Sequence, residues 1–485
     1  MTRDSGKIRF LGWAATAGIA ASVLLTILLG VLGPSAMVPT LPGPSWQPPF
    51  SLTTRPGGYL VIALGAAAIV LGGAGLAAGF AALARGWTFR ADLWVGAGIA
   101  AVVVLAFLPP SGSADHLNYA AYGRLAVLGH DPYTVPPEQL GGDPVAGAVE
   151  EWRGVTSVYG PVATAVQALA AVVGGDSVRL IVFVLAAVNA AAYAVTGLLL
   201  FRSAAGDDAR QRQVALLWAA NPLMIYHLSA GMHVDTLAIA CMVAALVCGA
   251  AGRHAASGLL LGIGVGVKAT AGLVALGPAW ELRRSPRSLA IVTACAVAVA
   301  GIAYAVAGPQ VLNQVGAAGR RVSLAVPWSL MKRGLQHAFG PGAYTVWIQV
   351  GSLLLMAVLV VLLLRAFSRA QHRAPQAAEV AVAVVVAWLF SSAYALPWYD
   401  GLAFALLALA FQPGLAAFMT ARVSVLSLAY LPARQAGQPP GAREWLVDGV
   451  RANIVPWLLL ALTGALMWWA WRAGRGQGSA RPGHR

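Results

Sequence analysis

Long uncharged, apolar runs recur along the whole chain, and short polar segments separate them. Each run is about twenty residues long, which is the length that a helix needs to cross a hydrocarbon layer of roughly 30 Å. The runs lie at 10–33, 59–84, 93–109, 180–201, 214–232, 236–252, 288–312, 341–364, 380–399, 401–421 and 452–471. Because backbone groups in lipid must be satisfied within the protein, this spacing predicts helices. We therefore expect an all-α polytopic membrane protein with about 11 to 13 transmembrane helices.

The composition agrees with this class and changes how the net charge is interpreted. Hydrophobic residues make up 59% of the chain and charged residues 10%, which excludes an ordinary soluble domain. A net charge of +15 would suggest nucleic acid as a partner of a soluble protein, but here the cations gather in short loops between spans. These loops are predicted to be cytoplasmic, and no nucleic-acid partner is expected. The cations concerned are Arg3, Lys7, Arg9, Arg85, Arg90, Arg202, Arg210, Arg212, Arg283, Arg284, Arg287, Arg365, Arg369, Arg373, Arg472, Arg475, Arg481 and Arg485.

The first apolar run follows three basic residues, as in a secretory signal peptide. It is longer than the roughly 7 to 15 apolar residues of such a peptide, so we expect a retained span with a cytoplasmic N-terminus. The predicted organisation is two N-terminal transmembrane helices in residues 1–91, a membrane domain in 92–471 and a disordered basic tail in 472–485.

Residues 110–177 form a long polar segment between two apolar runs. They contain seven of the seventeen acids of the chain, with Arg124 and Arg153 as the only cations, so the segment is predicted to be extracytoplasmic. Asp115 lies within six residues of Pro109, where the preceding run ends. A carboxylate held at a membrane surface and followed by tyrosines suggests chemistry on a polar substrate that a lipid delivers. The sequence therefore predicts a membrane enzyme.

Two short helices are expected within this segment. Leucine and alanine recur at helical spacing over 114–128 with polar residues on the other side, so this helix is predicted to rest along the membrane interface. Gly129 ends it, and prolines make the following loop stiff. The apolar stretch from Tyr159 to Val173 is too short to cross, and we expect a partly embedded helix there.

The stretch 255–280 is long enough to cross once, yet basic residues that are predicted to be cytoplasmic flank both of its ends. Its centre is rich in glycine and carries Lys268, which suits a re-entrant pair of half-helices that turn beside a polar cavity. A lysine in lipid would be costly, so Lys268 should face protein, water or an anion. It could bind an anion, or it could pair with a carboxylate or with backbone carbonyls.

The segment 309–341 is also predicted to lie outside, although it contains cations and no acid. External cations without an acidic partner favour a lipid phosphate at the outer leaflet, and the alternative is nonspecific attraction to anionic headgroups. The cations are Arg320, Arg321, Lys332 and Arg333.

Two further external corners carry polar side chains. His233 and Asp235 lie between short spans, where they could orient a sugar, assist Asp115 or serve only as caps. As a metal site this pair is weak, since no third ligand follows at a recognisable spacing, and we expect no bound metal or cofactor. Trp398, Tyr399 and Asp400 could form a sugar platform, or the aromatic residues could anchor the chain at the interface. Arg422, inside an apolar stretch, could mark a cytoplasmic turn between two short spans near Gln412-Pro413-Gly414.

These positions together suggest a reaction. A hydroxyl that attacks a sugar carried on a lipid phosphate needs a base near the nucleophile and cations around the departing phosphate. Asp115 is the candidate base. The candidate cations for the phosphate are Lys268, Arg320, Arg321, Lys332 and Arg333.

The motifs resemble those of a known family. Asp115 after a span, Tyr119-Ala120-Ala121-Tyr122-Gly123-Arg124, Gly129-His130-Asp131-Pro132-Tyr133, Trp152 and Tyr159-Gly160-Pro161 are similar to the first external loop of GT-C glycosyltransferases. The match is nearest to the actinobacterial polyprenol-phosphate-mannose-dependent α-1,6-mannosyltransferases that build the mannan of lipomannan. His233, Asp235, Lys268 and the stretch 396–400 also resemble that family, so the likeness covers most of residues 90–470.

The resemblance implies a GT-C-type fold with residues 92–471 as the membrane catalytic domain. It implies an inverting transfer of mannose from a polyprenyl-phosphate-mannose donor to a glycolipid or mannan acceptor, on the outer face of the plasma membrane. Asp115 would be the general base, and any role of a second acid would fall to Asp131 or Asp235. The residues expected to bind sugar or acceptor are His116, Tyr119, Arg124, Asp131, Tyr133, Tyr159, His233, Asp235, Trp398 and Tyr399.

Two other classes compete with an enzyme. A transporter or lipid flippase could also contain broken helices and intramembrane charge, but such proteins commonly have paired halves, and the second half has no counterpart of the 110–177 loop. A non-catalytic envelope scaffold would leave Asp115 and the external cations without a role.

Overall fold

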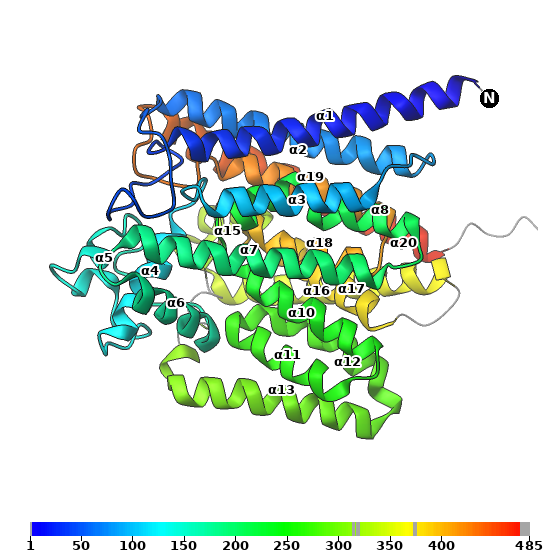
Figure 1. Cartoon of the computed structure of the whole chain (residues 1–485). Coiled ribbons are helices and arrows are strands. Elements are labelled where there is room, and N and C mark those ends of the chain that lie inside the picture. The colour runs from blue at the N-terminus through cyan, green and yellow to red at the C-terminus, as the bar shows by residue number, and fades with distance from the viewer. Residues whose placement is uncertain (1, 313–315, 317–320, 372–375, 476–485) are drawn as a thin grey trace, which may run out of the picture.

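The computed structural model describes residues 2–312, 316, 321–371 and 376–475, and within them the chain is helical and has no strand. The helices run side by side along one direction, as expected of an all-α membrane protein (Figure 1). The N-terminus, α8, α12 and the end of α20 lie at one end of this bundle, and α4, α5, α6 and α15 lie at the other (Figure 1). We call the latter the loop end.

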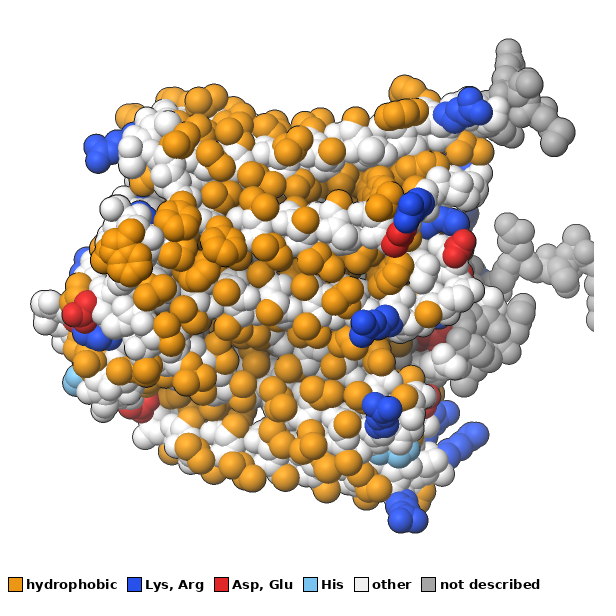
Figure 2. Space-filling view, viewed as in Figure 1, with side chains coloured by type: hydrophobic (Ala, Val, Ile, Leu, Met, Phe, Trp, Pro, Cys, Tyr) orange, Lys and Arg blue, Asp and Glu red, His pale blue; other side chains and the backbone are white. Residues whose placement is uncertain are grey.

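The long apolar runs of the sequence form the longer helices. These are α1 (Thr2–Leu32), α2 (Gly58–Leu83), α3 (Ala91–Ala106), α7 (Val178–Ser203), α10 (Asp235–Ala250), α13 (Pro286–Ala307), α16 (Thr345–Gln371), α17 (Ala377–Ser391), α19 (Pro413–Ala429) and α20 (Val455–Arg475). Six helical stretches are long and apolar enough to cross a membrane, the first at Ser5–Leu32 and the last at Glu444–Arg475. The distribution of side chains over the surface agrees with a membrane protein. One face of the molecule is mainly hydrophobic between its two ends, and most of the Lys and Arg side chains on that face lie at the end with the N-terminus (Figure 2).

Shorter elements build the loop end and the turns. They are α4 (Asp115–Val127), α5 (Pro144–Gly147), α6 (Pro161–Gly174), α8 (Asp208–Val214), η2 (Ala215–Ala219), α9 (Pro222–Met224), η3 (Ile225–Ala230), α15 (Pro327–Phe339), η6 (Pro397–Tyr399), α18 (Asp400–Leu409) and η7 (Glu444–Ile454). The run 214–232 is broken because Asn221 caps α9 and Pro222 begins it.

The helix predicted at 114–128 is present as α4, but its predicted surface position is wrong. Residues on nearly every side of α4 are buried, including Leu117, Tyr119 and Tyr122. It packs against α6 so closely that a Cβ on Gly123 would lie 2.1 Å from the carbonyl oxygen of Gln167. The leucine spacing therefore reflects burial in protein rather than contact with headgroups. The short apolar stretch after Tyr159 forms α6, whose Leu169, Val172 and Val173 are exposed.

The predicted re-entrant pair around Lys268 is seen as a hairpin. The chain enters through α11 (His254–Val267), turns at Lys268 and returns through η4 (Ala269–Ala275), α12 (Leu276–Glu281) and η5 (Leu282–Arg284). The turn packs on the start of α6, where the Gly160 amide donates to the Val267 carbonyl at 3.0 Å. A Cβ on Gly160 would lie 2.2 Å from the Gly266 carbonyl oxygen, so only glycine permits this approach.

The turn predicted near Gln412-Pro413-Gly414 is present, because α18 ends at Leu409 and α19 begins at Pro413. The role predicted for Arg422 is wrong. It does not mark the turn, because it lies inside α19, is 2% exposed and pairs with Asp400. In the tail predicted to be disordered, residues 472–475 belong to α20. The remainder, 476–485, lies outside the described residues.

Candidate active site

Asp115 is the first residue of α4, where the long loop meets the bundle. Two backbone hydrogen bonds hold the segment before it: the Ser111 amide donates to the Ala230 carbonyl and the Gly112 amide donates to the Met37 carbonyl, each at 2.8 Å. The Asp115 amide donates to Ser113 Oγ at 3.1 Å. The carboxylate keeps 21% of its surface exposed and lies 3.5 Å from His233 Nδ1. The carboxylate is therefore accessible, and hydrogen bonds of the surrounding backbone fix the position of Asp115.

His233 reaches Asp115 from the corner between η3 and α10. Its ring stacks on Trp398 at a centroid distance of 3.7 Å and an interplanar angle of 11°, and it is 1% exposed. Stacking fixes the plane of the imidazole, so Nδ1 stays directed toward Asp115. The residue before it in the corner, Met232, has a φ of +53°, a strained conformation of the kind that clusters at functional sites.

Lys268 and Asp235 form the second half of the site. Lys268 Nζ lies 2.5 Å from Asp235 Oδ1 and 3.9 Å from the centre of the Tyr399 ring. Of the two predicted roles for Lys268, the pairing with a carboxylate is the one seen. Because α11 and α10 are antiparallel neighbours, the last turn of one brings its lysine to the first residue of the other.

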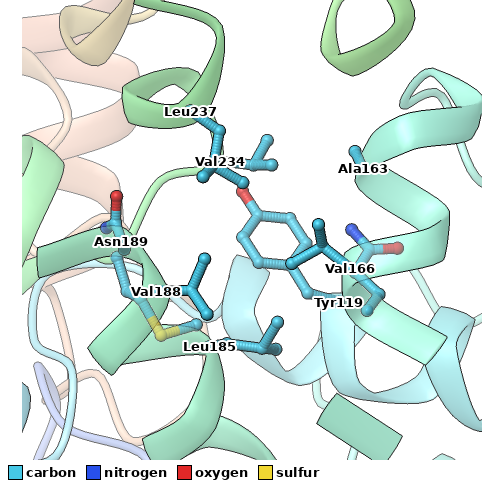
Figure 3. A pocket seen from close by; sticks show the side chains of 10 residues that line it. Tyr119, Ala163, Val166, Leu185, Val188, Asn189, Val234 and Leu237 are labelled. Atoms are coloured by element: carbon cyan, nitrogen blue, oxygen red, sulfur yellow. The ribbon is translucent and has the colours of Figure 1, made fainter. Parts of the chain in front are cut away.

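Two tyrosines of the long loop complete the cluster. The rings of Tyr119 and Tyr159 meet edge to face at 5.0 Å, and the Tyr159 hydroxyl donates to the Tyr119 hydroxyl at 3.4 Å. Tyr119 also lines an apolar recess between α6, α7 and α10 (Figure 3). Gln167 and Asn189 line it as well, but it has room for only about one water molecule. The recess is too small to be the substrate cavity in this conformation.

The electrostatics of Asp115 suit a base that works near neutral pH. Burial, with the charges of Glu151 and Asp235, raises the pKa of Asp115 to about 7, against the opposing charge of Lys268. A general base is most effective when its pKa lies near the working pH. The neighbouring imidazole of His116 is fully buried, which lowers its pKa to about 3, and neither of its ring nitrogens has a hydrogen-bond partner among the described residues. His116 is thus enclosed, and no surface of it is open to a sugar.

Several predicted sugar-binding residues are engaged elsewhere in the loop. Arg124 pairs with Asp143 at 2.7 Å and with Asp176 at 2.6 Å. Asp131 Oδ1 accepts from the Tyr133 amide at 2.9 Å and so forms a local turn. The Tyr133 hydroxyl lies 2.7 Å from Thr164 Oγ1 and the side chain is buried. These contacts give Arg124, Asp131 and Tyr133 a part in folding the loop.

The predicted phosphate-binding cations do not form one cluster with Lys268. Arg320 lies outside the described residues. Arg321 lies over the Trp152 ring at 5.6 Å, close to the tyrosines of the site. Lys332 and Arg333 are on α15, and Arg333 donates to Asn453 Oδ1 at 2.7 Å and to the Ala452 carbonyl at 2.9 Å. Within the described part of the chain, no carboxylate pairs with Arg321, Lys332 or Arg333.

Two features of the site were not predicted from the sequence. Glu151 is a charged neighbour of Asp115, so the second acid is not confined to Asp131 or Asp235. Asp400, expected in a sugar platform with Trp398 and Tyr399, is instead buried and paired with Arg422. A lone acid and a lone arginine in neighbouring apolar runs were a usable signal for the latter, because buried charges need partners. As for metals, the described residues include no group of three His, Cys, Asp or Glu side chains that could hold an ion.

Comparisons with known proteins add a family signal. Residues 15–284 match a family model described as "Alpha-(1->6)-mannopyranosyltransferase, N-terminal domain". Similar proteins include alpha-(1->6)-mannopyranosyltransferase A of Corynebacterium glutamicum, which is 31% identical over 36% of this chain and 36% of its own length. The protein of the same name from Mycobacterium tuberculosis is 28% identical over 60% of each chain. A probable alpha-(1->6)-mannopyranosyltransferase of Mycolicibacterium smegmatis is 32% identical over 33% of this chain and 29% of its own.

The aligned segments therefore span 36% and 60% of the length of the first two relatives, less than two thirds of either. No solved structure matches the chain.

Proposed function

We propose, from the premise that this chain belongs to the alpha-(1->6)-mannopyranosyltransferase family, that it is an inverting mannosyltransferase. Its donor is a polyprenyl-phosphate-mannose and its acceptor is a mannan or lipomannan-type glycan, extended through α-1,6 linkages. The protein lies in the plasma membrane with its N-terminus in the cytoplasm, and the loop end faces the outside. The gathering of basic side chains at the opposite end supports this orientation.

The observation that carries the proposal is the accessible Asp115 carboxylate beside His233, at 3.5 Å. In the reaction, the acceptor hydroxyl gives its proton to Asp115 and its oxygen attacks the anomeric carbon of mannose. The bond between that carbon and the phosphate oxygen breaks, and polyprenyl phosphate leaves with the electron pair. Because attack comes from the face opposite the phosphate, a β-linked donor yields an α-linked product.

His233 is suited to hold the base and not to replace it. Its ring is locked against Trp398, and Nδ1 is the atom that faces the carboxylate. Nδ1 makes no hydrogen bond to the described residues at this distance. A neutral imidazole with its proton on Nδ1 has the donor to form one with Asp115 and so orient the carboxylate. Trp398 and Tyr399 come from η6 and line the same cluster. His233 covers one face of Trp398 and Lys268 covers one face of Tyr399, so a pyranose ring would have to pack on the parts of the rings that these contacts leave free.

Lys268 is the cation best placed for the leaving phosphate. It contacts Asp235 and the Tyr399 face, and its charge acts on Asp115. A phosphate that arrives beside Lys268 would share the ammonium group with Asp235, and its developing charge would be stabilised there. Arg321, near Tyr122 and Tyr394, is the second candidate.

The test is transfer from radiolabelled polyprenyl-phosphate-mannose in membranes that contain Asp115→Asn. Loss of the base should reduce transfer by about 100-fold or more while the protein remains inserted. The matched control is Asp92→Asn. Asp92 is an exposed aspartate in the first turn of α3, and it pairs with Arg90. Near-normal transfer by Asp115→Asn would remove Asp115 as the base, and no transfer by the unaltered protein with any mannan acceptor would remove the proposed function.

A further inference from the structure

The loop between α19 and η7, residues 430–443, reaches back over the long catalytic loop. Its Arg434 is 7% exposed and pairs with Glu150 through two nitrogens, with Nε at 2.5 Å from Oε2 and Nη2 on Oε1. Its Nη1 donates to the carbonyl oxygen of Ser35. A bidentate guanidinium and carboxylate pair is among the strongest side-chain contacts, because geometry and charge act together. One arginine thus joins three parts of the chain that lie far apart in sequence.

The next residue continues this contact. The Gln435 backbone amide donates to Glu151 Oε1, so Glu150 and Glu151 are both held by the same short loop. Directly after them, Trp152 has a φ of +57°, a left-handed conformation that costs free energy for a bulky residue. Arg321 over the Trp152 ring and the Tyr122 hydroxyl on the Val155 carbonyl, at 2.9 Å, brace the same turn. Contacts from several elements therefore impose this turn.

The same loop is tied to the segment that carries Asp115. Gly437 packs beside Ala36, and a Cβ added to Gly437 would lie 3.7 Å from the Ala36 Cα. Residues 35–37 in turn hold the catalytic segment, because the Met37 carbonyl accepts from the Gly112 amide at 2.8 Å. Arg434 also acts electrostatically on His116, the neighbour of Asp115. We call residues 434–437 the strap, since they connect the two acids 150 and 151 with the backbone that precedes Asp115.

Charged and titratable groups from several elements face Asp115. The charged or titratable ones are Glu151, Asp235, Lys268 and His233. Five tyrosines also sense its charge: Tyr119, Tyr122, Tyr159, Tyr394 and Tyr399. Of the acids, Glu151 acts on Asp115 more strongly than Asp235, and it is the one whose place depends on the strap.

We propose that the strap holds Glu151 in the active site, so that Glu151 and Arg434 are positioning residues that tune the base Asp115. This rests on the proposed function, since it concerns the same site. Removal of the Glu151 charge removes a repulsion from ionised Asp115, so Asp115 then loses its proton at lower pH. Arg434 pairs with Glu150, so its removal releases the turn in which Gln435 holds Glu151. Glu151 then moves away from Asp115, and the pKa of Asp115 falls as it does when the Glu151 charge is removed.

The experiment compares Glu151→Gln, Arg434→Gln and the double variant with the unaltered protein and with Arg443→Gln. Arg443 is an exposed arginine in the same loop and serves as the matched control. The first readout is the pH dependence of kcat for mannosyl transfer. The second is the pH dependence of carbodiimide labelling of Asp115 in purified protein, followed by mass spectrometry, which reports the protonated carboxyl without any turnover.

We expect the acidic limb of both profiles to move down by about one pH unit in Glu151→Gln and in Arg434→Gln, as for loss of one nearby charge. The double variant should show no further shift, because both changes act through one group. Arg443→Gln should superimpose on the unaltered protein. An unmoved labelling profile in Glu151→Gln would overturn the proposal, as would a lower kcat in Arg434→Gln at every pH with an unmoved limb. If the unaltered protein transfers no mannose, the proposed function fails, while the labelling still tests the strap.

Discussion

At the scale of single residues, the site consists of ordinary side chains whose properties depend on their surroundings. The pKa of an aspartate at the surface lies well below 7, whereas burial and two acidic neighbours raise the pKa of Asp115 to about 7. Lys268 has the opposite effect, because it favours the ionised carboxylate. Asp115, the proposed base, therefore lies between competing charges, and each of these charges can be removed separately.

The pH dependence of the reaction follows from this arrangement. Only ionised Asp115 can accept a proton, so kcat should rise with pH through about 7 and fall as Asp115 becomes protonated below it. Replacement of the cation by Lys268→Met should move this limb to higher pH, since an interaction that lowers the pKa is lost. The measurement is the rate of transfer as a function of pH. Arg90→Gln is the control, because Arg90 lies at the start of α3 and Asp115 follows the other end of that helix. A limb that shifts down in Lys268→Met would contradict the assignment.

At the scale of elements, a buried ion pair fixes the helices behind the site. Arg422 of α19 pairs with Asp400 at the start of α18 and donates to the Leu389 carbonyl of α17 at 2.8 Å. Since η6 ends at Tyr399, the residue before Asp400, this pair also sets where Trp398 and Tyr399 lie. Three helices and the aromatic side of the site thus depend on one guanidinium.

We expect Arg422→Met to destabilise the protein by about 3 to 5 kcal/mol, because Asp400 would remain buried without its cation. The double variant Arg422→Met with Asp400→Leu should recover most of this loss, since no charge then stays in the core. Thermal unfolding in detergent would measure both, with Arg365→Met on α16 as a control outside the pair. Equal destabilisation by the single and double variants would show that packing, and not the charge, is what matters.

At the scale of the whole molecule, the arrangement of helices brings distant corners to one end. Asp115, His233, Lys268 and Trp398 come from four separate connections between helices, and all of them meet in one cluster. The long loop, the strap and α15 lie at this end, while the N-terminus and the end of α20 lie at the other (Figure 1). The proposed chemistry requires that this end faces the outside, where the glycosylated lipid is presented.

Cysteine labelling in intact cells tests this orientation. With Cys241, Cys248 and Cys295 replaced by alanine, single cysteines would be placed at exposed positions: Gly141 in the long loop, Gly334 on α15 and Ala205 before α8. A membrane-impermeant maleimide should label the first two and reach the third only after permeabilisation. Labelling of Gly141→Cys and Gly334→Cys from opposite faces would disprove the shared end and with it the proposed reaction.

Much of the architecture was predictable because it depends on local pattern. Apolar runs of the length of a span predict helices, and the distribution of arginine predicts which ends share a side; the hairpin at Lys268 followed from these two signals alone. Asp115 was predicted because it is the only acid directly after the third span. The turn between α18 and α19 was predicted from Gln412-Pro413-Gly414, whereas the ion pair of Arg422 was not. The burial of α4 was missed because its leucine spacing fits a membrane surface and a protein interior equally well.

Chain order and side-chain type therefore determined that this protein is a bundle of membrane helices with a carboxylate at the mouth of a long loop, since hydrophobic length and charge asymmetry are properties of neighbouring residues. Only the tertiary structure decided which polar groups meet there. The ion pairs Lys268 with Asp235, Arg422 with Asp400 and Arg434 with Glu150 join residues 33, 22 and 284 positions apart. Each of these residues has several possible partners of the opposite charge in the sequence. Only the packing of the helices decides which partner lies within reach.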